Sequence, residues 1–138
     1  MSTPAALRPG LKGQVEIVVA EEHTAPHVGS GRVHVLATPI MVNLMEAAAL
    51  QAVEGLLGAG QQTVGSHLDI THVAATPVGM RVCATAELTQ VVKNRLTFSV
   101  HAEDARERIG AGIHERIIIN LARFDQRMQE KLALLPKT

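Results

Sequence analysis

The pattern of hydrophobic and polar positions changes its period along the chain and separates one long helix from several strands. Gly13–Ala20 is rich in β-branched residues, which predicts a strand. Good helix formers then fill Pro39–Leu57, and Gly58 follows them as a helix-ending signal. Beyond this point apolar and polar residues alternate in Arg81–Thr89 and in Arg95–Glu103. Such alternation is typical of antiparallel strands with one buried face.

Weaker signals complete the order of the elements. His23–Arg32 has the glycines and proline of a loop, and Lys93-Asn94 fits a tight hairpin turn. Val64–Thr71 is expected to be a short strand, Arg108–Leu121 a long final strand, and Phe124–Leu135 a terminal helix. A strand, a long helix and four further antiparallel strands predict one two-layer α+β domain over residues 1–138.

The long helix is apolar almost all round, and the chain has very few aromatic residues. Between Ile40 and Val53 only Asn43, Glu46 and Gln51 are polar, which indicates a buried helix. The chain has two Phe, no Trp or Tyr, and a formal net charge of zero. Little aromatic core area and little electrostatic repulsion favour a chain that buries more apolar surface against a second copy.

The composition argues against several classes of function. Basic residues show no excess or stripe, unlike those of most nucleic-acid-binding proteins. The single cysteine, Cys83, excludes an internal disulfide and a cysteine-based zinc cluster. No apolar run approaches the ~20 residues that span a membrane, and the N-terminus lacks a signal-peptide pattern. We therefore expect a cytoplasmic protein without nucleic-acid or membrane partners.

Three polar side chains have both a structural and a chemical explanation. Glu46 lies in the middle of the apolar helix, where it must either face a solvated edge or serve a site. Thr38 precedes Pro39 and is a good helix N-cap, which is enough to explain it. His72 lies where a strand enters a Pro-Gly turn, either as a surface residue or as a proton carrier near neutral pH.

Further histidines form two groups of unequal interest. On a strand, His114 and Arg116 would share one face and Glu115 the other, as part of a site or as a solvated edge. His23 and His27 lie in the predicted loop with few carboxylates nearby, so a metal site is disfavoured. The sequence also lacks a phosphate-binding loop, a dinucleotide fingerprint and a nucleophile elbow.

Four segments stand in order along the chain and carry a resemblance. They are Ala37–Glu46, Thr71–Gly79, Val82–Leu88 and Gly110–Arg116. Together they resemble the hotdog-fold acyl-CoA thioesterases, in the branch that contains fluoroacetyl-CoA thioesterase. The resemblance implies a hotdog fold, in which a curved antiparallel sheet wraps a long helix. It also implies a homodimer that associates through its sheets and builds its site at the subunit interface.

The same resemblance implies roles for five residues. Thr38, Glu46 and His72 match the catalytic threonine, glutamate and histidine of the family. Gly65 matches a glycine whose backbone lies beside the thioester, and Arg116 matches an active-site arginine. The implied reaction is hydrolysis of an acyl-CoA to a free acid and CoA, without a metal or redox cofactor. Attack by Thr38, by Glu46 or by water remains open.

Two alternatives accompany this interpretation. A non-catalytic acyl-CoA-binding or regulatory module would keep the fold without turnover. A hotdog dehydratase or carrier-protein-dependent enzyme fits the matched residues less well. Fluoroacetyl-specific members of the family carry aromatic residues before the catalytic threonine, whereas His27–Leu36 has none. We therefore expect a graded preference among small or medium acyl-CoAs.

Overall fold

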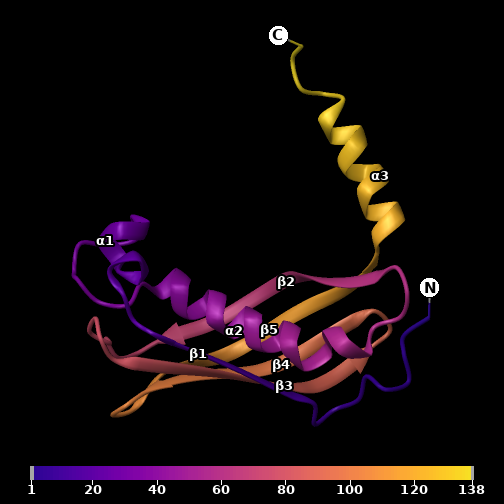
Figure 1. Cartoon of the computed structure of the whole chain (residues 1–138). Helices are drawn as coiled ribbons and strands as arrows, with labels where there is room; N and C mark the ends of the chain where they lie inside the picture. The colour runs from indigo at the N-terminus through magenta and orange to yellow at the C-terminus, as the bar shows by residue number, and fades with distance from the viewer. Residues whose placement is uncertain (1, 138) are drawn as a thin grey trace.

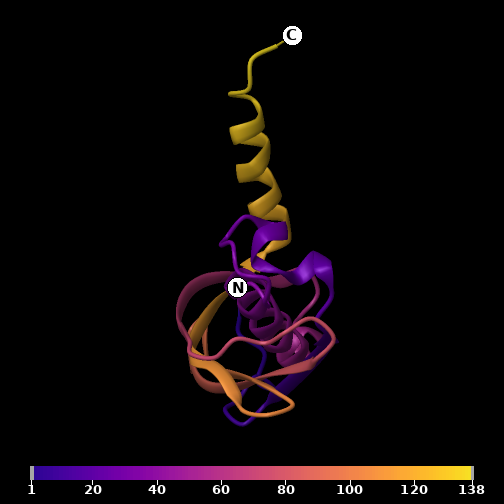
Figure 2. The same ribbon diagram turned by 90° about the vertical axis from the view of Figure 1, so that its left-hand side faces the viewer.

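In the computed structural model, which describes residues 2–137, one long helix lies against a five-stranded antiparallel sheet (Figure 1). The strands are β1 (Lys12–Val18), β2 (Gln61–His72), β3 (Arg81–Val92), β4 (Arg95–Asp104) and β5 (Arg108–Asn120). Their order across the sheet is β1-β3-β4-β5-β2, so β1 and β2 form its edges. The sheet curves around the helix (Figure 2). This arrangement confirms the predicted α+β hotdog fold.

The long helix, α2 (Thr38–Val53), ends four residues earlier than predicted and continues as a 3-10 turn, η2 (Glu54–Leu56). Its exposed face carries Asn43 and Gln51, so within one chain the helix is not buried all round as predicted. The face toward the sheet is buried at spacings of three and four residues. Its members are Met41, Leu44, Met45, Ala48, Ala49, Ala52 and Val53.

Small residues let the helix approach the sheet very closely. A Cβ atom added to Gly13 on β1 would lie 2.0 Å from the backbone oxygen of Ala48, so strand and helix backbones are in direct contact. The core is otherwise filled by aliphatic and Met side chains around Phe98, the largest fully buried residue. This close contact explains how the chain builds a core with so few aromatic residues.

Of two predicted connections between elements, the hairpin turn is confirmed, and the long loop contains short helical turns that were not predicted. The predicted loop at His23–Arg32 contains the end of a 3-10 turn, η1 (Glu21–His23), and a short helix, α1 (Ala25–Val28). The hairpin turn at Lys93-Asn94 is confirmed, and Lys93 adopts the left-handed conformation with φ 56°. On β2 an extra residue, Ser66, interrupts the pairing with β5 between Gly65 and His67.

The terminal helix, α3 (Leu121–Leu132), begins three residues earlier than predicted. The side chain of Asn120 caps it by accepting a hydrogen bond of 3.1 Å from the backbone N–H of Arg123. The helix projects away from the sheet, beyond edge strand β2 (Figures 1 and 2), and only Phe124 and Met128 are half-buried. Within residues 2–137, no helix has the length and apolar character needed to cross a membrane.

Candidate active site

Thr38 and His72 form the first polar pair of the site. The N-cap of α2 is Ala37, so Thr38 is the first helical residue and its side chain makes no cap hydrogen bond. The N-cap prediction for Thr38 is therefore wrong, because Pro39 occupies the second helical position rather than the first. The Thr38 Oγ1 atom instead lies 2.7 Å from Nδ1 of His72, the last residue of β2. The Thr38 hydroxyl is therefore available to exchange a proton with His72, which a hydroxyl engaged in a helix cap would not be.

The half-buried His72 side chain has one satisfied and one unsatisfied ring nitrogen. Its Nε2 atom is buried and has no hydrogen-bond partner among the described residues. Burial lowers the pKa of His72 below its ordinary value, and the nearby backbone of Ala74 acts in the opposite direction. The imidazole is therefore neutral at pH 7 and can accept the Thr38 proton at Nδ1. Burying a polar atom without a hydrogen bond costs free energy, so we expect Nε2 to bond to a group other than the described residues.

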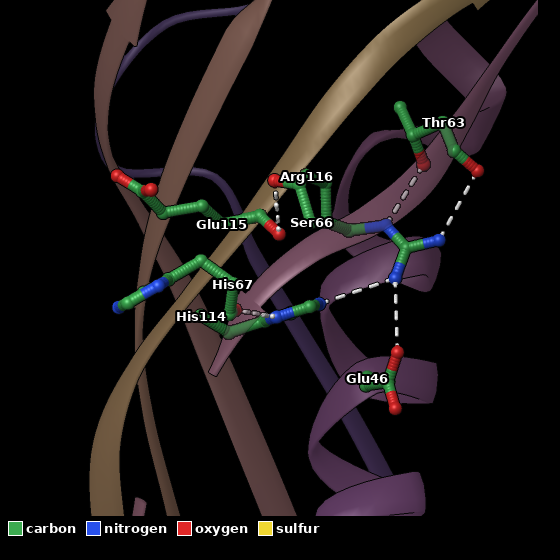
Figure 3. A network of polar contacts seen from close by, with 7 residues as sticks. All are labelled: Glu46, Thr63, Ser66, His67, His114, Glu115 and Arg116. Atoms are coloured by element: carbon green, nitrogen blue, oxygen red, sulfur yellow. Dashed lines mark hydrogen bonds and ion pairs between the residues drawn. The ribbon is translucent and has the colours of Figure 1, made fainter. Parts of the chain in front are cut away.

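Glu46 and Arg116 form the second polar pair, at the middle of α2 (Figure 3). Nη1 of Arg116 lies 3.7 Å from Oε2 of Glu46; the arginine side chain is 8% exposed and the glutamate 36%. Arg116 is held by hydrogen bonds of 2.9 Å from Nε to Oγ1 of Thr63 and 3.1 Å from Nη2 to the Thr63 carbonyl. Glu46 therefore does more than face solvent at a helix edge, because it lies beside the buried positive charge of Arg116.

His114 helps to hold Arg116 in place through a hydrogen bond. Its Nε2 accepts a hydrogen bond of 3.1 Å from Nη1 of Arg116, and its Nδ1 donates to the His67 carbonyl at 2.9 Å. Since Nε2 is an acceptor, the ring is neutral, and burial lowers the pKa of His114 in agreement. The interpretation of His114 and Arg116 as a solvated edge is therefore wrong. Glu115 faces the other way, as predicted, and accepts from Thr97 Oγ1 at 3.3 Å.

Gly65 completes the second group, because a side chain there would displace the Glu46 carboxylate from its present position. It pairs with Arg116 in the β2–β5 register, immediately before the bulge at Ser66. A Cβ atom at Gly65 would lie 2.8 Å from Oε2 of Glu46 and 3.3 Å from Cε1 of His114. The glycine thus leaves room for the carboxylate and exposes a strand backbone beside it.

The two polar groups line two different hollows of the same chain. Thr38 and His72 line a hollow of about 360 Å³ whose walls also include aliphatic and small residues of the segments 30–36 and 73–75, together with Arg32. Glu46 and Gly65 line another, of about 270 Å³. On α2, Thr38 and Glu46 are separated by about 12 Å of helix rise. Within one chain the predicted site residues therefore form two separate sets. Thr38 and His72 make up the first, and Glu46, Gly65 and Arg116 make up the second.

Two supporting residues, Thr63 and His114, were not assigned a role from the sequence. The alternation that placed His114 on the same strand face as Arg116 was the available signal, whereas Thr63 gave none. His23 uses its Nδ1 to accept from the Ala20 backbone N–H at 2.9 Å, and His27 is exposed. Over residues 2–137 the structure contains no group of three or more metal-ligating side chains.

The fold and the two polar pairs agree with the resemblance to the hotdog-fold thioesterases, and comparisons with known proteins identify the family. A family model described as fluoroacetyl-CoA-specific thioesterase matches residues 19–122. A fluoroacetyl-CoA thioesterase from Streptantibioticus cattleyicolor is 42% identical over 97 residues, 70% of each chain. The chain therefore belongs to the fluoroacetyl-CoA-specific thioesterase family, and it is a thioesterase of the acyl-CoA hydrolase class.

Solved structures extend the comparison to three dimensions. A threonine-to-serine variant of fluoroacetyl-CoA thioesterase in complex with acetyl-CoA matches with a TM-score of 0.85 and 35% identity, over 91% of this chain and 98% of that one. A hot-dog-like protein from Thermanaerovibrio acidaminovorans, 19% identical, shares the fold with a TM-score of 0.83 over 94% of each chain. The family match ends at residue 122, so nearly all of α3 lies beyond it.

Proposed function

We propose that the chain hydrolyses short acyl-CoA thioesters at a site shared between two subunits of a homodimer. The observation that carries this proposal is the division of the polar residues into two sets within one chain. Thr38 and His72 form one set and Glu46, Gly65 and Arg116 the other. A dimer can place the Thr38–His72 pair of one subunit opposite the Glu46 set of its partner. If the dimer is symmetric, it then contains two such shared sites.

The free edge of the sheet supports this assembly. Strand β2 is an edge strand, and its residues Ser66–Asp69 are exposed. Such an edge presents unpaired backbone groups and readily adds another strand. The same strand carries both Gly65 and His72, one from each set. Association of two β2 edges would place both sets at the interface and cover the open face of α2.

The chemistry follows from the two sets. In the proposed reaction His72 takes a proton from the Thr38 hydroxyl, or from a water molecule that this hydroxyl holds. When water attacks, its oxygen bonds to the thioester carbon and the carbon–sulfur bond breaks as the proton passes from His72 to the leaving thiolate, which gives the free acid and CoA. When Thr38 attacks, the same step leaves an ester on Thr38; a water molecule that gives its proton to His72 then hydrolyses this ester to the free acid and restores the hydroxyl. Backbone N–H groups near Gly65 are placed to stabilise the oxyanion. Glu46, which lies beside Arg116, orients the attacking group or the protonated His72.

Thiol release from a panel of acyl-CoAs tests the function. We expect hydrolysis of acetyl-, propionyl- and butyryl-CoA with a graded preference. The hollow beside Thr38 has no aromatic residue in its lining, so we expect its volume, rather than an aromatic lid, to discriminate between acyl groups. One methylene changes binding by only about 1–3 kcal/mol, and we expect kcat/KM for fluoroacetyl-CoA to exceed that for acetyl-CoA by less than ~100-fold. Absence of thiol release with every substrate would favour a non-catalytic acyl-CoA-binding module.

The pH dependence of kcat/KM tests the assignment of His72. The rate is expected to rise with pH along a limb centred below the ordinary histidine value of about 6.5. The sign follows because protonated His72 cannot accept a proton, and burial lowers its pKa so that the neutral form persists in more acidic solution. His72→Ala should remove this limb, whereas His101→Ala on β4 should retain it. A limb that survives in His72→Ala would belong to another group, such as His114.

A further inference from the structure

A hollow of about 720 Å³ opens where β5 ends and α3 begins. It lies between the first turns of α3, the end of β5 and the N-terminal segment. Its lining includes Ile117, Ile119, Asn120, Arg123, Phe124 and Arg127. We call it the α3 groove. None of the residues assigned above to the proposed reaction lines it.

The charge of the α3 groove is one-sided in a chain whose net charge is zero. Arg123 and Arg127 are one helical turn apart, so they lie on the same face of α3. No Asp or Glu is among the described lining residues, and neither arginine forms an ion pair within residues 2–137. Two exposed guanidinium groups without acidic partners can attract an anion, and paired arginines suit phosphate oxygens especially well.

The groove also offers apolar surface for a flat ring. Phe124, one of only two aromatic residues in the chain, lines it together with Ile117 and Ile119. Phe124 is half-buried, so part of it remains accessible. Nucleobases stack on aromatic side chains and on arginine planes. Phosphate-binding and base-stacking groups thus occur side by side in one groove.

The distance between Gly65, in the Glu46 set, and the α3 groove matches the length of one particular ligand group. Gly65 pairs with Arg116, and four residues further along the same two strands Gln61 pairs with Asn120 at the groove. Four residues of strand correspond to about 13 Å. The pantetheine arm of CoA has about thirteen bonds between sulfur and the first phosphorus, equal to roughly four residues of extended chain, or about 14 Å.

We propose that the α3 groove binds the nucleotide end of CoA, with Arg123 and Arg127 on its phosphates and Phe124 against its adenine. This inference rests on the proposed acyl-CoA hydrolysis and identifies the part of the protein that recognises the CoA carrier. The residues concerned follow position 122, where the family match ends. Recognition of the carrier at this groove is therefore separate from the chemistry of the thioester.

Substrates with and without the nucleotide test this proposal. The variant Arg123→Gln/Arg127→Gln should lower kcat/KM for acetyl-CoA by at least ~10-fold, the scale of one lost charge-assisted hydrogen bond. Its kcat/KM for S-acetylpantetheine, which has no phosphate or adenine, should equal that of the wild type. Phe124→Ala should show the same asymmetry. The matched control Lys131→Gln/Lys137→Gln removes two charges from the far end of the same segment, outside the groove, and should leave both substrates unaffected.

Direct binding separates failure of this inference from failure of the proposed function. Adenosine 3′,5′-bisphosphate should bind the wild type at least ~10-fold more tightly than the double arginine variant, even if no thioester is hydrolysed. Inorganic phosphate at the same concentration should not compete with it. Equal losses with acetyl-CoA and S-acetylpantetheine, or no loss with either, would overturn the proposal. A change in mass by light scattering in the double variant would assign the groove to contacts between copies and would also overturn it.

Discussion

Glu46→Gln is expected to lower turnover of acetyl-CoA at least ~100-fold, the usual scale for losing acid–base participation. The substitution preserves the shape of the side chain and removes its charge. KM should change less than kcat, because the amide has the size of the carboxylate and can fill the same place beside Gly65. The measurement is kcat and KM by thiol release, with Glu54→Gln at the exposed end of the helix as the matched control.

The same variant should lose little stability. The Glu46–Arg116 contact is long, at 3.7 Å, and the glutamate side chain is 36% exposed, so water can take the place of the lost charge beside the guanidinium. Arg116 keeps its hydrogen bonds to Thr63 and His114. We expect the melting temperature to fall by only a few degrees. Unchanged turnover would return Glu46 to the role of a polar residue at a helix edge.

Mixed dimers of Glu46→Gln and His72→Ala chains are expected to recover about half of the wild-type rate, because one of their two sites is intact. In the proposed dimer the Thr38–His72 pair and Glu46 come from opposite subunits. The Glu46→Gln chain contributes an intact His72 to one site, and the His72→Ala chain contributes an intact Glu46 to the same site. Each single variant alone should be nearly inactive. Differently tagged chains allow the mixed dimer to be isolated and assayed.

A reciprocal mixture provides the control. A chain carrying both Glu46→Gln and His72→Ala, paired with a wild-type chain, has one substitution in each shared site and should be nearly inactive. If all three residues served a site within one chain, this second mixture would be half active and the first inactive. Light scattering of the wild type should give twice the chain mass of 14.7 kDa. A stable monomer with full activity would contradict the shared site.

Periodicity predicted the elements of the fold well, and local chemistry placed their ends less well. The alternation of β3 and β4 and the long apolar helix are confirmed. The α-helix ends at Val53, before the glycine signal at Gly58, because its last turn tightens to a 3-10 turn that needs no glycine. The Thr38 prediction failed because proline is accepted at either of the first two helical positions, and this choice moves the cap by one residue.

The contacts of the site depend on strand register, which the sequence does not specify on its own. Glu46 meets Arg116 because Gly65 lies opposite Arg116 and leaves space between them. That register follows from a bulge at Ser66, whose one extra residue changes which β2 side chains face the helix. The alternation of β5 correctly placed His114 beside Arg116, but it could not indicate that this face was the buried one.

The direct contact between β1 and α2 fixes the geometry of the site in a way that side-chain packing alone would not. Where Gly13 touches Ala48, no layer of side chains separates strand from helix. Side chains can change rotamer and absorb a substitution, whereas two backbones in contact have no such freedom. The backbone contact therefore limits how far α2 can shift against β1 at this point. We expect substitutions in the segment before Thr38 to change acyl preference without changing the spacing between Thr38 and Glu46, because both residues lie on this one helix.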